Sequence, residues 1–234
     1  MTVPSDRYVP ALGVRWLTAL YDPLVAATTR ERRFKHELLR QAALKPGMRV
    51  LDLGCGTGTL AISAKRMSPE ARIVGVDGDS EVLARARAKA GRAGADVRFQ
   101  RALSFALPFP ADSFDVVLST LFFHHLGPSD KRRTMLEVYR VLAPGGRLHV
   151  ADWGRPANIL ARALFVSVQL LDGFATTADN VAGRLPQYMT EAGLTQAREV
   201  GRHHTMYGTL AFYQAVKPGG AAQVWHSPGR RAQL

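Results

Sequence analysis

The feature that most constrains the fold is the segment Val50–Thr59, VLDLGCGTGT, together with Ile73–Asp77, IVGVD. The apolar start of the first segment predicts a buried strand. Three glycines at alternate positions then remove Cβ atoms where the chain leaves the strand, so its backbone can approach a ligand. A helix from Thr57 to Met67 would present free N–H groups. Asp77 ends the next strand, where a carboxylate can accept hydrogen bonds from both hydroxyls of a ribose.

The glycine spacing differs from Gly-x-Gly-x-x-Gly, the pattern of dinucleotide-binding proteins. Thr59 stands where the third glycine of that pattern belongs, and Gly58 comes one residue early. Asp52 lies two positions before the loop, where a carboxylate would repel a pyrophosphate and would suit a ligand with an ammonium group. The alternative is a Rossmann-like loop that binds NAD or no ligand.

This pattern resembles the class I S-adenosylmethionine-dependent methyltransferases, whose motif is a hydrophobic strand followed by Asp/Glu-x-Gly-x-Gly-x-Gly. Two further segments have the spacing of the type-11 methyltransferase domain, LPFPADSFDVV at Leu107–Val117 and LEVYRVLAPGGRL at Leu136–Leu148. The resemblance covers about Lys45 to Asp152, and the nearest broad group is the ubiquinone/menaquinone C-methyltransferase-like proteins. It implies a Rossmann-like methyltransferase fold, S-adenosyl-L-methionine as cofactor and S-adenosyl-L-homocysteine as product.

The resemblance also implies where the cofactor binds. Many relatives carry Gly-Asp-Ala before the Leu-Pro-Phe turn, and its Asp contacts the adenine amino group. Here the aligned residues are Ala102-Leu103-Ser104, so the Ser104 hydroxyl or a backbone group at Leu103–Ser104 would replace that contact. Tyr21 matches a tyrosine that relatives place near the cofactor. The cofactor-binding residues that we expect are Tyr21, Asp52, Gly54, Cys55, Gly56, Thr57, Gly58, Asp77, Gly78, Leu103, Ser104 and Ser119.

Two adjacent histidines follow the fourth predicted strand, in the segment Ser119–Leu126, STLFFHHL. A neutral imidazole of His124 or His125 could accept a proton from a nucleophile, since its ordinary pKa is about 6.5. The alternative is that both rings only pack in the structure. Two adjacent side chains chelate poorly, so we expect no metal. We interpret Cys55 as a small residue tolerated in the glycine loop rather than as a nucleophile.

Strands and helices alternate along the chain, which predicts a doubly wound, mainly parallel α/β sheet of seven strands. The strands are expected near 48–53, 72–77, 96–99, 114–119, 146–152, 195–201 and 206–216. The helices are expected near 58–67, 80–91, 129–142 and 178–192. The last two strands should form an antiparallel hairpin, as in the fold of the family. Ser129 is a candidate cap for the third of these helices.

Three further segments lie outside this alternation. Residues 1–44 are expected to form N-terminal helices on a methyltransferase domain of residues 45–216, and residues 217–234 to form a flexible basic tail. Within the domain, residues 153–180 are apolar almost all round. A helix of that kind must be buried or roof a cavity, so we expect a cover over the carboxyl ends of the strands.

Composition limits the location and partners of the protein. No apolar stretch approaches the ~20 residues that cross a membrane, and the N-terminus lacks the apolar region of a signal peptide. A single cysteine suits a reducing cytoplasm. The net charge of +12 would suit nucleic acid, a peripheral membrane contact or an acidic substrate. The basic residues are scattered through the predicted helices without interleaved aromatics, which argues against nucleic acid. We interpret the charge as the result of a genome rich in Ala, Gly and Arg codons rather than as a sign of a charged partner. The sequence does not indicate an oligomeric state.

The predicted reaction is in-line methyl transfer to a small, partly hydrophobic acceptor. Amino-methylating DNA enzymes place Asn/Asp/Ser-Pro-Pro-aromatic after the fourth strand, where this chain has Ser119-Thr120-Leu121-Phe122. Cytosine C5 methylation needs a cysteine in the catalytic pocket, and Cys55 lies in the glycine loop. Two alternatives stay open, an RNA-directed methyltransferase and a non-catalytic S-adenosylmethionine-binding protein.

Overall fold

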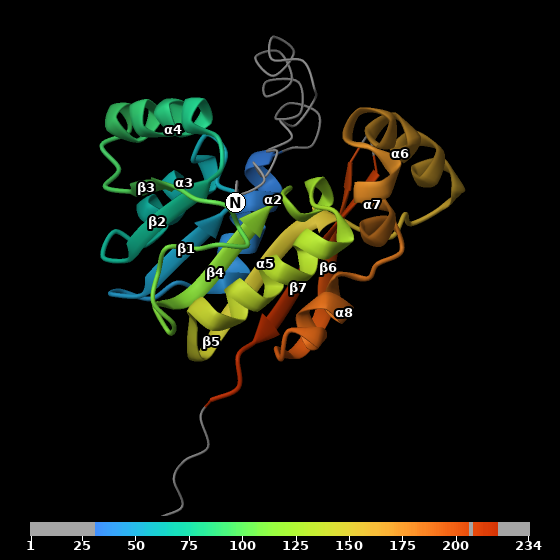
Figure 1. Ribbon diagram of the computed structural model, residues 1–234. Helices are drawn as coiled ribbons and strands as arrows, with labels where there is room; N and C mark the ends of the chain where they lie inside the picture. Colours follow the sequence, from blue (N-terminus) through green and yellow to red (C-terminus); the bar gives the residue numbers. More distant parts are fainter. Residues whose placement is uncertain (1–30, 206–207, 220–234) are drawn as a thin grey trace, which may run out of the picture.

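The protein is described by a computed structural model that covers residues 31–205 and 208–219 (Figure 1). The strands are β1 (Arg49–Leu53), β2 (Arg72–Asp77), β3 (Arg98–Arg101), β4 (Phe114–Thr120), β5 (Leu142–Trp153), β6 (Thr195–Thr205) and β7 (Gly208–Val216). The helices are α2 (Glu31–Ala42), α3 (Thr59–Met67), α4 (Ser80–Arg92), the short 3-10 helix η1 (Phe123–His125), α5 (Pro128–Val141), α6 (Ile159–Asp172), α7 (Phe174–Val181) and α8 (Leu185–Glu191). Tyr21 and most of the predicted N-terminal segment and tail lie outside the described residues.

The seven strands form one sheet in the order β3-β2-β1-β4-β5-β7-β6. The strands β1 to β5 run parallel to one another. β7 lies antiparallel between β5 and β6, so the last two strands form the expected antiparallel pair. This arrangement confirms the predicted mainly parallel α/β sheet.

The strand order reverses between β1 and β4. From β1 the chain builds β2 and β3 on one side, then returns to place β4 on the other side of β1. The loops that leave β1 and β4 therefore turn away from each other at the carboxyl edge of the sheet, the position where open α/β sheets bind ligands. This topology brings the glycine loop and the two adjacent histidines to the same edge.

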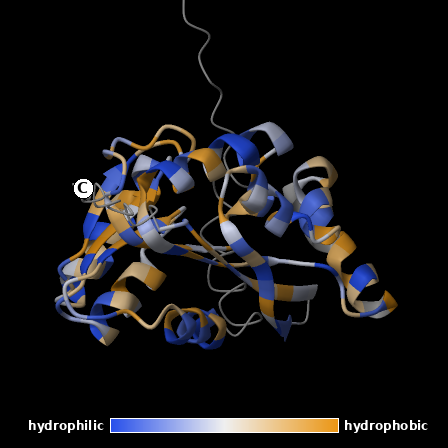
Figure 2. Ribbon diagram, turned by 90° about the horizontal axis from the view of Figure 1, so that it is seen from below, coloured by the Kyte–Doolittle hydropathy of each residue, from blue (hydrophilic) through white to orange (hydrophobic). Residues whose placement is uncertain are grey.

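Each face of the sheet has its own hydrophobic core. Helices α2, α3 and α4 cover one face with side chains that include Phe34, Leu38, Leu60 and Leu83. Helices α5 and α8 cover the other face with Met135, Val138, Leu185 and Met189. In Figure 2 hydrophilic and hydrophobic residues alternate along the helices, as amphipathic helices that cover a sheet require.

Several predicted boundaries are wrong for identifiable reasons. The helix expected over 178–192 is two helices, because Gly183 adopts φ +70° and Pro186 sits in the first turn of α8. The helix expected from Ser129 begins at Pro128 after Gly127, with no side-chain cap. Proline is favoured in a first helical turn because its missing N–H has no partner there in any case.

The apolar segment after β5 forms α6 and α7, but α6 is not buried on all sides. Phe165 is 1% exposed, whereas Leu164 is 44% exposed and Ile159 is 89% exposed. A helix that packs on β7 and α7 buries only the stripe that faces them. Among the residues that the structure describes, no helix has both the length and the apolar character needed to cross a membrane.

Candidate active site

The loop after β1 is fixed by backbone hydrogen bonds, and one of its glycines, Gly56, faces open space. The amide of Cys55 donates to the carbonyl of Val76 at 2.9 Å, which fixes the loop to the end of β2. Gly58 caps α3 with φ +74°, and a Cβ there would lie 2.7 Å from the ring of Phe99. At Gly56, with φ +52°, a Cβ would meet nothing within 4 Å. Gly58 is therefore required by packing, whereas Gly56 borders open space. Thr57, between them, is half-buried.

The carboxylate of Asp77 is bonded to this loop. Its Oδ2 accepts from the amide of Gly56 at 2.9 Å and its Oδ1 from the amide of Asp79 at 3.0 Å. Burial raises the pKa of Asp77, although these amides favour the charged form. The carbonyl of Gly78, the next residue, accepts from Nε of Arg101 at 3.0 Å. Asp77 thus lies at the end of β2, directly beside the glycine loop.

Asp52 anchors the start of α3. Its Oδ2 accepts from the amide of Ala61 at 3.0 Å, which satisfies one of the free N–H groups of the first helical turn. The side chain is buried, and among the described residues its Oδ1 has no hydrogen-bond partner. Burial raises the pKa of Asp52 to about 7, against the opposing influence of Lys35. An orphaned carboxylate oxygen of this kind suits a cation or a bridging water.

The loop after β3 lies next to Asp77, because the amide of Ala102 donates to the Asp77 carbonyl at 3.1 Å. The carbonyl of Leu103 accepts from the amide of Ala106, which closes a tight turn. The hydroxyl of Ser104 is buried and lies 2.8 Å from the hydroxyl of Thr134 on α5. The Ser104 side chain is thus engaged with α5.

Two further predicted residues have structural partners. The hydroxyl of Ser119, at the end of β4, donates to the carbonyl of Leu53 at 2.9 Å and ties β4 to the end of β1. The thiol of Cys55 is buried, and burial raises its pKa well above the ordinary range. A thiol that stays protonated is a poor nucleophile, and the role of Cys55 stays a prediction.

The two histidines of η1 differ in their surroundings. Nδ1 of His124 lies 2.6 Å from Oδ1 of Asp152, and both side chains are buried. A carboxylate only accepts, so Nδ1 carries the proton and Nε2 holds the lone pair when the ring is neutral. His125 stacks obliquely on His124 with 3.9 Å between ring centroids. Burial and the neighbouring His124 lower the pKa of His125 to about 3, so it is a weak base.

Asp152, at the end of β5, accepts hydrogen bonds from the backbone at the start of η1 and from the ring of His124. Its Oδ2 accepts from the amides of Phe122 and Phe123 at 3.1 and 2.7 Å, and its Oδ1 from the amide of Trp153 at 2.7 Å. Burial alone would raise the pKa of Asp152, but His124 and the Trp153 amide hold it below its ordinary value. Sequence reasoning missed this residue. The signal was an acidic residue near the end of a predicted strand, next to the strand that leads to the histidines.

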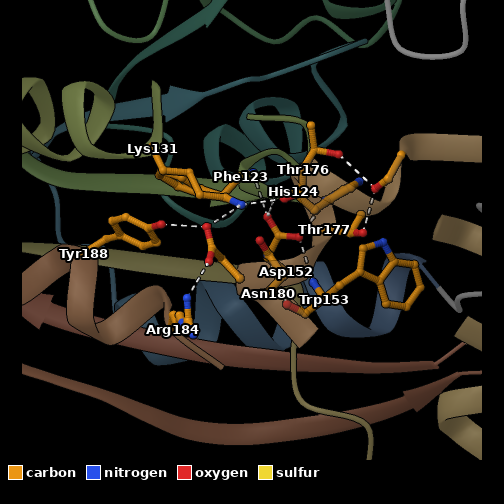
Figure 3. A network of polar contacts seen from close by, with 12 residues as sticks. Phe123, His124, Lys131, Asp152, Trp153, Thr176, Thr177, Asn180, Arg184 and Tyr188 are labelled. Carbon is orange, nitrogen blue, oxygen red and sulfur yellow. Dashed lines mark hydrogen bonds and ion pairs between the residues drawn. The ribbon is translucent and has the colours of Figure 1, made fainter. Parts of the chain in front are cut away.

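A second buried polar cluster joins α5, α8 and the end of β5 to α7 (Figure 3). Nζ of Lys131, on α5, donates to the carbonyl of Thr176 at 2.6 Å and lies 3.8 Å from Oδ2 of Asp179 on α7. The same Oδ2 accepts from the hydroxyl of Tyr188 at 2.6 Å. Asn180 donates to the carbonyl of Trp153 at 3.2 Å. These contacts of Lys131 and Asn180 hold α7 next to η1 and the end of β5. No sequence pattern indicated them.

The predicted site residues therefore divide into two groups. The glycine loop, Asp77, Gly78 and residues 102–104 are linked by hydrogen bonds, and Ser119 connects β4 to them through β1. His124 and His125 lie at the same sheet edge, after β4. Tyr21 lies outside the described residues, so its predicted contact stays a prediction. The described part of the chain contains no group of three residues that could hold a metal ion.

Comparisons with known proteins show the family. Residues 50–146 match the model of the methyltransferase domain family. The ubiquinone/menaquinone biosynthesis C-methyltransferase of a Marinomonas species is 31% identical over 170 residues, 70% of this chain and 67% of that protein. The chain belongs to the S-adenosylmethionine-dependent methyltransferases. S-Adenosylmethionine is accordingly its cofactor, and the NAD-binding interpretation is not supported.

Other relatives match over a shorter range. The demethylmenaquinone methyltransferase of Thermus thermophilus is 43% identical over 124 residues, 53% of this chain and 56% of that protein. The enzyme of the same description from Deinococcus radiodurans is 36% identical over 58% of this chain and 55% of its own length. These matches therefore cover little more than half of either relative.

Solved structures confirm the fold. An S-adenosylmethionine-dependent methyltransferase from Aquifex aeolicus superposes with a TM-score of 0.65 at 19% identity, over 90% of this chain and all of that one. Phosphoethanolamine N-methyltransferase 2 of Haemonchus contortus, in complex with S-adenosylmethionine, gives a TM-score of 0.65 at 17% identity, over 80% of this chain and 52% of that one. At these identities the likeness supports the Rossmann-like methyltransferase fold alone.

Proposed function

We propose that this methyltransferase transfers the methyl group of S-adenosylmethionine to a hydroquinone or related phenolic acceptor. The observation that carries the proposal is that the glycine loop after β1 and the His124–Asp152 pair lie at the same carboxyl edge of the sheet, where β1 and β4 are neighbours. The relatives named as demethylmenaquinone and ubiquinone/menaquinone C-methyltransferases support a quinol acceptor. The domain boundaries and a cytoplasmic location stay predictions.

Three parts of the described structure offer groups that would bind the cofactor. The Asp77 carboxylate would accept hydrogen bonds from the ribose hydroxyls, beside the open space at Gly56. The orphaned Oδ1 of Asp52 suits the ammonium group of the methionine part, directly or through water. The Ser104 hydroxyl is engaged with Thr134, so a backbone group at Leu103–Ser104 is the better supported adenine contact.

The chemistry needs a positioned acceptor and one proton acceptor. When bound, S-adenosylmethionine supplies an electrophilic methyl group on a sulfonium, so the chain needs no nucleophile of its own. Nε2 of His124 would take the hydroxyl proton of the acceptor, which makes the aromatic ring or its oxygen more nucleophilic. Asp152 holds the imidazole in the required tautomer and stabilises the imidazolium that forms. The ring of Trp153, 6.4 Å from that of His124, helps to exclude water from this edge.

The test is transfer of radiolabelled methyl groups to a panel of acceptors by the full chain. We expect label in short-chain naphthoquinols that lack the ring methyl group, and none in phosphoethanolamine or RNA. Label in a polar amine or RNA but not in any quinol would overturn the acceptor assignment. Binding of S-adenosylmethionine without transfer to any acceptor in the panel or in cell extract would favour a non-catalytic binding protein.

The role of His124 has its own test. His124→Gln keeps a polar side chain of similar size but cannot accept the proton, so kcat should fall roughly 100-fold or more while the affinity for S-adenosylmethionine is kept. His125→Gln is the matched control, because the low pKa of His125 makes it a weak base. Equal losses of kcat in the two variants would contradict the assignment of His124 as the base.

A further inference from the structure

Large apolar side chains are exposed mainly on one segment of the molecule. Among the described residues, three of the five exposed large hydrophobic side chains belong to α6 or to the start of α7. Ile159 is 89% exposed, Leu164 is 44% exposed and Phe174 is 51% exposed. The other two, Met67 and Leu136, lie on α3 and α5. Scattered exposed leucines are ordinary, whereas a concentration on one segment marks an interaction surface.

The composition of α6 explains this exposure. The helix has the sequence ILARALFVSVQLLD, with Arg162 and the terminal Asp172 as its only charged residues. One side is buried through Phe165, whose ring lies 5.3 Å from that of Trp153. A helix at the surface of a soluble protein usually carries polar residues on its outer side. Among the side chains of α6 that the structure describes, the exposed ones are Ile159, Ala163 and Leu164, with Arg162 as the exposed charged residue.

Among the side chains that the structure describes in this segment, the exposed charges are all positive. Of the side chains that the structure describes between 153 and 184, the exposed charged ones are Arg155, Arg162 and Arg184, and Asp179 is buried. Apolar side chains next to arginines are the pattern of segments that lie on anionic lipid. A second copy of the chain would bring arginines against arginines across a two-fold axis. Residues 1–30 are also unsuited to neutralise them, with three arginines and two aspartates.

Helix α6 lies close to the candidate active site. Figure 1 shows α6 and α7 beside β6 and β7, at the end of the sheet far from α4. The ring of Trp153 contacts Phe165 of α6 on one side and lies 6.4 Å from the ring of His124 on the other. One aromatic side chain therefore separates the packed side of α6 from the candidate base.

We propose that Ile159, Leu164 and Phe174, with Arg155 and Arg162, form a docking surface for an anionic lipid bilayer. We call these five residues the α6 surface. Docking there would place the candidate site close to a membrane-dissolved acceptor, and in this respect the proposal rests on the proposed quinol activity. The binding of the protein to lipid itself does not depend on that activity.

The test is co-sedimentation of the full chain with vesicles of equal parts phosphatidylcholine and phosphatidylglycerol. We expect the protein to bind these vesicles, and to bind pure phosphatidylcholine far more weakly. The triple variant Ile159→Ser/Leu164→Ser/Phe174→Ser should bind roughly tenfold more weakly or worse. Met67→Ser/Leu136→Ser is the matched control and should bind as the unaltered chain does. Arg155→Gln/Arg162→Gln should reduce binding most at low salt.

Three outcomes would overturn the proposal. They are no binding of the unaltered chain to anionic vesicles, equal binding by the triple variant, and a dimer in solution that the triple variant converts to monomer. Methyl transfer to a short-chain, water-soluble quinol separates this proposal from the proposed function. Turnover without vesicle binding refutes the docking surface alone, whereas vesicle binding without turnover refutes the quinol activity alone.

Discussion

At the scale of single residues, Asp152 fixes the segment that carries the candidate base. Its two oxygens accept from the backbone of η1, from Trp153 and from the ring of His124. The η1 donors lie 28 to 30 positions earlier in the chain, so no local sequence pattern indicates them. The motif containing Asp77 was easier to recognise, because its residues are adjacent in sequence and their spacing is set by one strand–loop–helix unit.

Asp152→Asn should destabilise the fold strongly. The amide replaces one buried acceptor oxygen by an N–H group that faces other N–H groups, so the free energy of unfolding should fall by about 3 kcal/mol. Urea unfolding measures this change. Asp115→Asn is the control, because its 2.6 Å ion pair with Arg49 is partly exposed and should contribute less than about 1 kcal/mol. Similar losses in both variants would contradict the role of Asp152.

His149 on β5 should make stability depend on pH. Neither ring nitrogen has a partner among the described residues, and burial, with Arg147 nearby, lowers the pKa of His149 to about 4. Between that value and the ordinary 6.5, the unfolded chain binds a proton that the folded chain does not. Stability from this group is therefore present above pH ~6.5 and falls by about 3 kcal/mol as the pH drops towards 4.

The measurement is urea unfolding of the unaltered chain and of His149→Leu at several pH values. Carboxylates contribute equally to both proteins, so the difference between the two curves isolates His149. We expect the difference to change in favour of the variant between pH 7 and pH 4.5. Parallel curves over this range would show that His149 titrates normally in the folded protein.

At the scale of elements, Lys131 should hold α7 in place. Lys131→Met removes a fully buried ammonium and leaves Asp179 with Tyr188 and Arg184, which should destabilise the protein by about 3 kcal/mol. The KM for the acceptor should rise, while the affinity for S-adenosylmethionine should stay unchanged because α7 lies away from the glycine loop. Titration calorimetry with S-adenosylmethionine, together with acceptor kinetics, separates the two effects.

Arg132→Met is the control for Lys131. Arg132 is the next residue on α5, but its side chain is 56% exposed where it contacts Glu191 and the ring of Tyr188. Its loss should change stability by about 1 kcal/mol or less. If Lys131→Met lowered the affinities for cofactor and acceptor equally, Lys131 would stabilise the whole fold. It would then not act specifically by positioning α7.

The hydrophobic periodicity of the sequence was sufficient to predict which segments are helices and which are strands. It did not predict the division between α7 and α8 or the exposure of α6. The strands of the parallel sheet are short apolar runs separated by amphipathic helices, a pattern that a sequence displays directly. Gly183 and Pro186 divide α7 from α8, and both residues were visible in the sequence as breakers. The apolar character of α6 predicted burial, but burial depends on how many neighbours the fold supplies. That number is a property of the tertiary structure.

At the scale of the whole molecule, the strand order explains why the site lies where it does. The reversal between β1 and β4 brings two loops to one edge although they lie more than 60 residues apart in the chain. The family motif was sufficient to predict the cofactor and this edge. It could not predict the contacts around His124, because they join residues of β5, α5 and α7 that lie far apart in the chain and outside the glycine-loop motif.

The most direct test of the account is the binding of S-adenosylmethionine by the full chain and by Asp77→Ala, measured by titration calorimetry. The unaltered chain should bind the cofactor. The variant should bind roughly 100-fold more weakly, because two charge-assisted hydrogen bonds to the ribose are lost. Asp79→Ala, which removes a neighbouring carboxylate that caps α4, should retain most of the affinity. Equal affinity of Asp77→Ala and the unaltered chain would contradict the assignment of this edge as the cofactor site.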